Sequence, residues 1–441
     1  MVVRLTFYGG VNEIGGNKIL LQDQDTAIFL DFGMSFSERR KFYSEPWLSP
    51  RDEKGLLELG ILPQLEGVYS FDHSSPSIEA VFLSHSHADH SLYISLLNRM
   101  IPVHCGEATA IILRSLAEIR PRSFETDMLG LELKTFRTGQ KTKIGSLEIE
   151  PIHVDHSVPG SYGYIIYTSA GAIAYSGDFR VHGTKPQMTL DFARKMAEAK
   201  PEIAIFEATN LMGADVSTER EVKMKVDKVV SGTSKIVLAD FSYVDVDRFR
   251  TFYEVARGSG RDLAISLKQA YLFTELKKIR GLDVPDIRTD ENILIYQRMK
   301  KRYYNWEREI LAYENVKEAS EVRGLQEKLI LVCSFYDLKE LVELKPEPGS
   351  NFILSGSEPF NEEQEVEFDK FINWLDHFGL PMHHIHCSGH VMPNELKRII
   401  SEVKPKKVFP IHTDHPELFG RFVSNLVDVE IPKKEVSYEI K

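Results

Sequence analysis

Short runs of apolar residues, broken by glycine and aspartate, recur along the first half of the chain. Runs of this length, bounded by turn residues, are typical of buried β-strands. Helix-length segments are few, at 91–100 and 107–118. Many strands with few helices favour a sandwich of sheets flanked by helices over a doubly wound parallel sheet. The runs predict strands at 4–8, 27–30, 80–83, 147–152, 163–167, 172–175 and 203–206.

Strand-like and helix-like segments alternate in the middle of the chain. A Ser-Thr cap followed by an acidic turn opens a helix at 217–231. Strand-like 235–239 and 262–267 then alternate with helix-like 246–257 and 270–280. This alternation predicts a parallel sheet with helical crossovers.

The pattern returns to that of the first half near the end of the chain. A helix is predicted at 366–378, a strand at 383–386, a helix at 394–403 and a last strand at 407–411. We therefore expect an α/β fold in which an αββα sandwich domain is interrupted by an inserted α/β domain with a parallel sheet. The expected division is 1–208 for the first part of the sandwich domain, 209–382 for the insert and 383–441 for the return segment.

Composition narrows the class of protein. The 441 residues are 42% hydrophobic, with no apolar run long enough to cross a membrane and no secretory signal at the N-terminus. Three cysteines, none in a Cys-x-x-Cys pair, argue against a disulfide framework and for a reducing, cytoplasmic location. The net charge of −11 on its own counts against nucleic acid as a partner.

A histidine-rich segment follows the predicted strand at 80–83. In extended backbone, side chains at i and i+2 point to one side, so His85 and His87 are expected to converge. Asp89 and His90 come after the strand, where a turn can aim them at a second point nearby. Imidazole and carboxylate suit Zn²⁺ or a similar divalent ion. A His-rich polar loop is the plainer reading, but His-x-His-x-Asp-His behind a buried strand is specific enough to indicate a metal site.

Further ligand candidates stand at the ends of other predicted strands: His156, Asp178 and His412. A carboxylate between cations can bridge them and hold two metals about 4 Å apart for hydrolysis. Asp31, another strand-end acid, is a candidate for orienting a ligand from behind. Each residue alone could be an ordinary polar group in a turn. It is their occurrence together that indicates a metal site.

Taken in order, these motifs resemble those of a known enzyme family. The opening Gly-Gly-Val-Asn-Glu-Ile-Gly at 9–15, with Asp31, the His85–His90 cluster, His156 and Asp178, resembles the metallo-β-lactamase-fold hydrolases. Glu207, His390 and His412 resemble motifs A, B and C of the β-CASP nucleases within that fold. The closest resemblance is to ribonuclease J of the archaeal type, without the C-terminal domain of the bacterial enzymes.

The resemblance implies a site with a pair of zinc ions, with Mn²⁺ or Mg²⁺ as alternatives in activity. Asp178 would bridge the metals, which activate water for attack on a phosphodiester, and His390, paired with Glu207, would protonate the leaving oxygen. The implied ligands are His85, His87 and His156 for one zinc and Asp89, His90 and His412 for the other.

The same resemblance implies a zinc-dependent ribonuclease acting on single-stranded RNA. A histidine at motif C goes with the RNA-acting members, and the chain has His412 there. A 5′→3′ exonuclease acting on 5′-monophosphate ends is expected, as a homodimer. An RNA endonuclease of the 3′-end-processing type and a non-catalytic RNA-binding subunit are the alternatives. The residues expected to bind RNA phosphates are Ser355, Ser357, His386, Ser388 and Gly389.

The segment 277–302 has a local charge of +4 and is followed by Tyr303, Tyr304 and Trp306. Such a run is usually a solvated face. Basic groups beside aromatic rings also suit single-stranded nucleic acid. The sequence leaves the two readings even.

Overall fold

A computed structural model describes residues 2–44, 47–72, 74–213, 217–356 and 362–440. The chain forms two compact units: unit 1 comprises Met1–Ala214 and Gly389–Lys441, and unit 2 comprises Asp215–Ser388. Each unit is described by itself. The domain boundaries expected from the sequence, after residues 208 and 382, stay a prediction.

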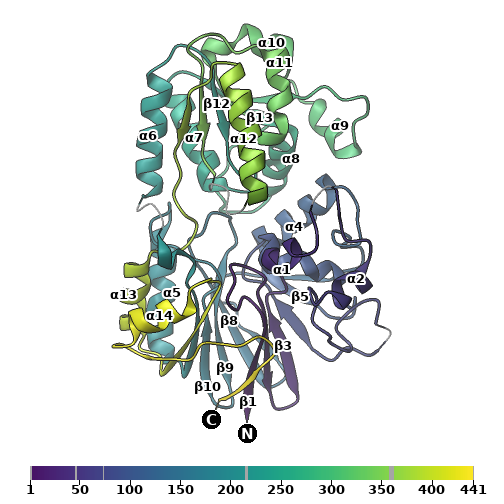
Figure 1. Ribbon diagram of the computed structural model, residues 1–441, viewed down its shortest axis with the longest axis vertical. Helices are drawn as coiled ribbons and strands as arrows, with labels where there is room; N and C mark the ends of the chain where they lie inside the picture. Colours follow the sequence, from purple (N-terminus) through teal and green to yellow (C-terminus); the bar gives the residue numbers. More distant parts are fainter. Residues whose placement is uncertain (1, 45–46, 73, 214–216, 357–361, 441) are drawn as a thin grey trace. The chain divides into compact units, whose positions relative to one another are not determined.

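Unit 1 is built on two seven-stranded sheets (Figure 1). The first has the order β21-β1-β2-β3-β4-β5-β6. Antiparallel pairs join β21, β1, β2 and β3, and parallel pairs continue from β3 to β6. Its strands are β1 (Val3–Gly9), β2 (Lys18–Asp23), β3 (Thr26–Leu30), β4 (Ala80–Phe82), β5 (Val103–Gly106), β6 (Leu133–Phe136) and β21 (Ser437–Ile440).

The second sheet of unit 1 has the order β20-β19-β11-β10-β9-β8-β7. The pairs from β20 to β10 are parallel, and those from β10 to β7 are antiparallel. Its strands are β7 (Thr142–Ile144), β8 (Leu147–His153), β9 (Tyr162–Thr168), β10 (Gly171–Tyr175), β11 (Ile203–Glu207), β19 (Lys407–Ile411) and β20 (Asp428–Val429).

The two sheets pack face to face and helices cover their outer faces. Apolar side chains of both sheets, such as Phe7, Ile28, Ile149 and Phe409, share one buried cluster. Helices α5, α13 and α14 lie on the side of the second sheet, and α1, α2 and α4 on the side of the first (Figure 1). This is an αββα sandwich. The helices are α1 (Phe36–Arg40), α2 (Glu53–Glu58), α3 (Ala88–Ser91), α4 (Glu107–Ile119), α5 (Pro186–Ala199), α13 (Pro393–Val403) and α14 (Pro416–Val423), with 3₁₀ turns at Leu92–Leu96 and Thr209–Met212.

Unit 2 is built on one seven-stranded, fully parallel sheet of order β15-β14-β13-β16-β12-β17-β18. Its strands are β12 (Val237–Asp240), β13 (Asp262–Ser266), β14 (Ile293–Gln297), β15 (Val316–Glu318), β16 (Leu329–Val332), β17 (Asn351–Leu354) and β18 (Met382–His384). Its helices are α6 (Glu219–Ser231), α7 (Val246–Gly258), α8 (Leu267–Leu276), α9 (Asn305–Leu311), α10 (Ala319–Gly324), α11 (Leu341–Leu344) and α12 (Glu362–His377), with 3₁₀ turns at Gln326–Lys328 and Phe335–Glu340.

The α/β class, the interrupted sandwich and the parallel sheet expected from the sequence are confirmed by this architecture. One helix prediction was wrong: 91–100 is not a helix, since α3 ends at Ser91 and a 3₁₀ turn, Leu92–Leu96, follows. Tyr93, Ile94 and Leu96 are all buried there, so the segment is apolar around its circumference and not amphipathic. No helix among the described residues is long and apolar enough to cross a membrane.

Candidate metal centre

Polar side chains gather in unit 1 where strands of both sheets end. His85 follows β4, Asp178 follows β10 and His412 follows β19. Asp89 and His90 lie on the short helix α3, and His156 lies beyond β8. All seven metal ligands expected from the sequence are brought together: one group joins His85, His87, His156 and Asp178, another joins Asp89, His90 and His412, and a third joins Asp178, His390 and His412.

Asp178 belongs to the first group and also approaches the second. Its Oδ2 is 3.6 Å from Nε2 of His85 in the first group. The same oxygen is 3.1 Å from Nε2 of His90 and 3.7 Å from Nε2 of His412 in the second. One carboxylate therefore faces both groups, which is the placement expected for a bridging ligand.

Hydrogen bonds fix the orientation of four rings. Nδ1 of His85 lies 3.0 Å from Oγ of Ser84, and Nδ1 of His156 donates to the Gly389 carbonyl at 2.6 Å. Nδ1 of His90 donates to Asp31 at 2.7 Å, and Nδ1 of His412 lies 2.8 Å from Oγ1 of Thr209. With Nδ1 engaged in each ring, Nε2 is the nitrogen that faces the cluster.

The residues fit a metal ion. Nδ1 of His87 lies 3.0 Å from Nε2 of His85 and 3.2 Å from Nε2 of His156, so three ring nitrogens converge. Burial lowers the pKa of His87 to about 4 and the pKa values of His85 and His156 well below their ordinary range. Neutral imidazoles offer the lone pairs that a metal ion binds, and here three such rings face one point. Oδ1 of Asp178 is buried and has no hydrogen-bond partner among the described residues.

Charge in the second group is balanced differently. Burial by itself would lower the pKa of His90, but Asp178, Asp89 and Asp31 raise it well above its ordinary value. Burial would raise the pKa of Asp178, yet His412, His90 and His390 hold it well below its usual range. The carboxylate of Asp178 is therefore ionised and available to a cation.

Asp31 lies behind His90 and is completely buried. It accepts hydrogen bonds from the backbone N–H and hydroxyl of Ser84, at 2.6 and 2.7 Å, and from the hydroxyl of Tyr175 at 2.5 Å. Asp31 thus touches groups that orient both His85 and His90, as expected for a residue that holds ligands from behind.

His390 and Glu207 lie beside the metal ligands. Nδ1 of His390 is 3.4 Å from Oε1 of Glu207 and 3.7 Å from Oδ2 of Asp178. Burial would lower the pKa of His390, but Glu207 and Asp178 raise it to about 9. Oε1 of Glu207 also accepts the backbone N–H of Val391 at 3.0 Å, which fixes the chain next to His390.

Thr209 has no role in the sequence-based interpretation, yet it links three site residues. Its hydroxyl donates to Glu207 at 2.8 Å and lies 3.3 Å from Nδ1 of His390, besides its contact with His412. Ser84, Tyr175 and Asn17, which lies 3.3 Å from His90, were missed in the same way. Hydroxyl and amide residues are too common along the chain to give a signal by themselves.

The expected phosphate-binding residues fall on both units. Gly389 lies in unit 1, where an added Cβ would come to 3.0 Å from the ring of His156, so a larger residue would press on this proposed ligand. Ser355, His386 and Ser388 lie in unit 2, and Ser357 lies outside the described residues. Oγ of Ser355 is buried, donates to the Ile385 carbonyl and accepts from Arg248, each at 2.6 Å.

Arg248 organises this part of unit 2. Its guanidinium is buried and donates to Glu219 at 3.0 Å as well as to the carbonyl of Ser355 at 2.6 Å. Its Nη1 lies 3.4 Å from Nδ1 of His386, whose pKa burial and then Arg248 lower to about 4. The segments after β17 and β18 are thus tied to one buried cation.

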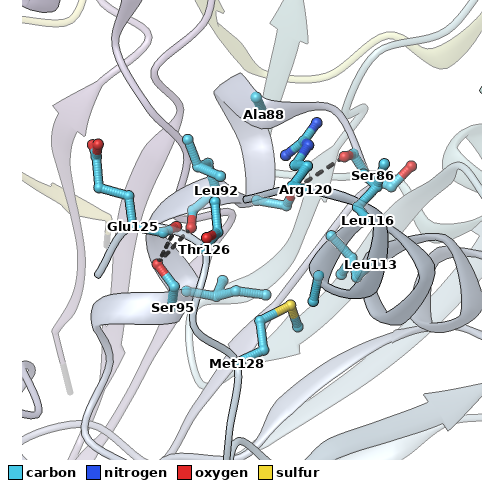
Figure 2. A pocket seen from close by; sticks show the side chains of 13 residues that line it. Ser86, Ala88, Leu92, Ser95, Leu113, Leu116, Arg120, Glu125, Thr126 and Met128 are labelled. Carbon is cyan, nitrogen blue, oxygen red and sulfur yellow. Dashed lines mark hydrogen bonds between the residues drawn. The ribbon is translucent and has the colours of Figure 1, made fainter. Parts of the chain in front are cut away.

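A small pocket lies elsewhere in unit 1 (Figure 2). Leu113, Leu116 and Met128 line it together with Ser86 and Ala88, which flank His87 in the sequence. None of the proposed metal ligands lines the pocket. The pocket is therefore not the proposed reaction centre.

Comparisons with known proteins agree with this geometry. Residues 63–224 match the Beta-lactamase superfamily domain, and residues 380–418 match the Zn-dependent metallo-hydrolase RNA specificity domain. The first match contains six of the seven expected ligands, and the second contains His390 and His412. The cluster is therefore the candidate metal site of a hydrolase.

Curated relatives cover nearly the whole chain. Ribonuclease J of Thermus thermophilus is 24% identical over 92% of this chain and 67% of its own length. Ribonuclease J2 of Bacillus subtilis is 23% identical over 94% of this chain and 69% of its own length. The chain spans about two thirds of the length of these relatives.

Among solved structures, a protein of unknown function from Enterococcus faecalis has a TM-score of 0.80 at 22% identity, over 100% of both chains. It shares the fold. The chain therefore carries a β-lactamase superfamily domain and a Zn-dependent metallo-hydrolase RNA specificity domain, and the relatives that it resembles over most of its length are ribonuclease J proteins.

Proposed function

We propose that this protein is a zinc-dependent ribonuclease that hydrolyses single-stranded RNA from 5′-monophosphate ends in the 5′→3′ direction. The observation that carries the metal-dependent chemistry is the convergence of six proposed ligands around a seventh, Asp178. The RNA specificity domain matched at 380–418 and the ribonuclease J relatives support RNA as the substrate.

We assign the ligands as two sets that share Asp178. When bound, zinc lowers the pKa of water to about 7 and offsets the negative charge that develops on a phosphodiester. The proposed sets are His85, His87 and His156 for one ion and Asp89, His90 and His412 for the other.

His390 would donate a proton to the leaving oxygen of the RNA. Glu207 lies 3.4 Å from Nδ1 of the ring, where a carboxylate favours the protonated form and fixes the ring plane. Thr209 would keep Glu207 in place through its hydroxyl, which donates to Oε2 at 2.8 Å. In unit 2, Ser355, His386 and Ser388 are proposed to contribute to phosphate binding, as is Gly389, the first residue of the C-terminal stretch of unit 1.

The test is a degradation assay on RNA that is labelled in the base of its first nucleotide and carries a hydroxyl, a monophosphate or a triphosphate at its 5′ end. Release of labelled mononucleotide, fastest from the monophosphate, is the expected result. Internal fragments would instead indicate an endonuclease of the 3′-end-processing type. Bound zinc with no cleavage of any substrate would indicate a non-catalytic RNA-binding subunit.

A matched pair of variants ties activity to the site. His412→Ala removes a proposed ligand and should abolish cleavage and reduce bound zinc. His415→Ala, an exposed histidine three residues further along, should do neither. Equal activity in both variants would contradict the assignment of His412 as a ligand.

We also propose that the protein is a homodimer and that it is cytoplasmic. Sedimentation velocity tests the homodimer.

A further inference from the structure

The loop between β14 and α9, residues 298–304, carries side chains that the metal site does not use. Met299 is 85% exposed and Tyr304 is 61% exposed. Tyr336, after β16, is 76% exposed. One exposed apolar side chain is ordinary on a protein surface, but three large ones on neighbouring loops indicate a contact surface.

Hydrogen bonds hold this loop in one shape. The hydroxyl of Tyr303 accepts from Nε2 of Gln297 at 3.0 Å and donates to the carbonyl of Arg298 at 3.2 Å. Arg298 also pairs with Asp337 at 2.5 Å, which ties the loop to the segment that carries Tyr336. Met299 and Tyr336 are sequence neighbours of this ion pair. An ordered backbone therefore presents the exposed side chains together.

The loop also carries positive charge that no nearby described acid neutralises. Lys300 pairs with Glu307, whose side chain is buried. Lys301 and Arg302 are exposed, and no described acid lies within ion-pair distance of either. Two uncompensated cations thus stand beside Tyr304, although the whole chain has a net charge of −11.

Within unit 2, the loop lies at the end of the sheet where the parallel strands have their carboxyl ends. Because the sheet is fully parallel, the loop after β14 lies at the same end as Ser355 after β17 and His386 after β18. Ligands of open α/β sheets bind at this end of the strands. The order β14-β13-β16-β12-β17 places four strand spacings between the two sites, which is about 19 Å at roughly 4.8 Å each.

We propose that the 298–304 loop and Tyr336 form a stacking surface for single-stranded RNA. Bases would stack on Tyr304 and Tyr336 and contact Met299, while Lys301 and Arg302 bind the phosphates between them. The surface lies several nucleotides from the phosphate-binding residues proposed in unit 2. This inference rests on the proposed function, because it takes RNA as the substrate and adds where its chain runs.

The first test measures the dissociation constant of a labelled oligouridylate by fluorescence anisotropy. All proteins carry His390→Ala, which slows cleavage and keeps the proposed metal ligands. Met299→Ala with Tyr304→Ala should weaken binding by about five-fold or more, whereas Met224→Ala, a 63% exposed methionine on α6, should leave it unchanged. Unchanged binding in the loop variant overturns the proposal and leaves a protein partner as the occupant.

The second test measures salt dependence. Lys301→Ala with Arg302→Ala should reduce the slope of log affinity against log salt by about 1.4, since each phosphate contact on a single strand contributes about 0.7. Lys225→Ala with Lys228→Ala removes equal charge from exposed positions on α6 and should leave the slope unchanged. An equal change of slope in both double variants would mean that only the net charge matters, and would overturn the proposed stacking surface.

These outcomes separate the two proposals. If the wild-type protein cleaves RNA and the loop variants bind RNA as tightly as their His390→Ala parent, the stacking surface is wrong and the ribonuclease stands. If the wild-type protein neither binds nor cleaves RNA, the proposed function fails as well.

Discussion

At the scale of single residues, Asp31 supports two of the proposed metal ligands without belonging to either group. It is fully buried and accepts hydrogen bonds from Ser84, Tyr175 and His90. Its backbone has a positive φ of 57°, which asparagine tolerates better than most residues. Asp31→Asn therefore weakens the hydrogen bonds behind His90 and His85 with little backbone strain.

We expect Asp31→Asn to lower zinc affinity by about 10-fold to 100-fold, the range found when partners behind a metal ligand are removed. Competition with a chromophoric chelator measures this affinity. Asp23→Asn is the control, because Asp23 is equally buried and accepts from Ser169 instead of from a ligand. Equal affinities in the wild-type protein and Asp31→Asn would show that Asp31 serves the fold alone.

The sequence located the candidate ligands but not what orients them. His85, Asp178 and His412 could be found because each follows an apolar run that predicts a strand. The positive φ of His412, 54°, and the hydroxyl contacts of Thr209 leave no such trace. They depend on how chain segments far apart in the sequence meet.

At the scale of elements, the ends of the parallel strands in unit 2 concentrate polar groups in a buried setting. Asp240, the last residue of β12, accepts the backbone N–H of Phe335 at 3.2 Å. Burial, with help from Asp337, raises its pKa from 3.8 to about 6. The folded protein thus keeps a proton at this carboxyl over a pH range in which the unfolded chain has released it.

Asp240 should therefore cost stability as the pH rises. Below about pH 4 the carboxyl is protonated in both states and costs nothing, and the cost grows until about pH 6 and then stays constant. Asp240→Asn should stabilise unit 2 at pH 7.5 by up to about 3 kcal/mol, at roughly 1.4 kcal/mol per pKa unit, and give no gain at pH 4. Urea unfolding at both pH values measures this. A gain of equal size at pH 4 would point to packing and not to ionisation.

Element prediction from the sequence worked best where an apolar run was short and bounded. β10, β11 and β19 lie where the pattern placed strands. The prediction failed at 91–100, because the buried 3₁₀ turn Leu92–Leu96 has the apolar content expected of a helix. Strands such as β6 and β7 are partly exposed, so their alternating residues gave no continuous apolar run.

At the scale of the whole molecule, net charge is a poor guide to the partner. The value of −11 argued against nucleic acid, yet the site of unit 1 is built to take cations and the 298–304 loop of unit 2 is locally basic. Exposed acids elsewhere keep the average negative. Attraction to RNA would be confined to a few phosphates, so its salt dependence should be modest.

All proposed ligands lie in unit 1, so the two compact units should respond differently to metal removal. An ion that binds only the folded state stabilises it by RT ln(1 + [L]/Kd), about 4 kcal/mol at a thousand-fold excess over Kd. We expect calorimetry of the full chain to show a transition that shifts down when a chelator removes the metal and is restored by zinc. A second transition should keep its midpoint under chelator but respond to Asp240→Asn. A single transition that shifts as a whole would mean that the units unfold together, and an absence of any shift would contradict the ligand assignment.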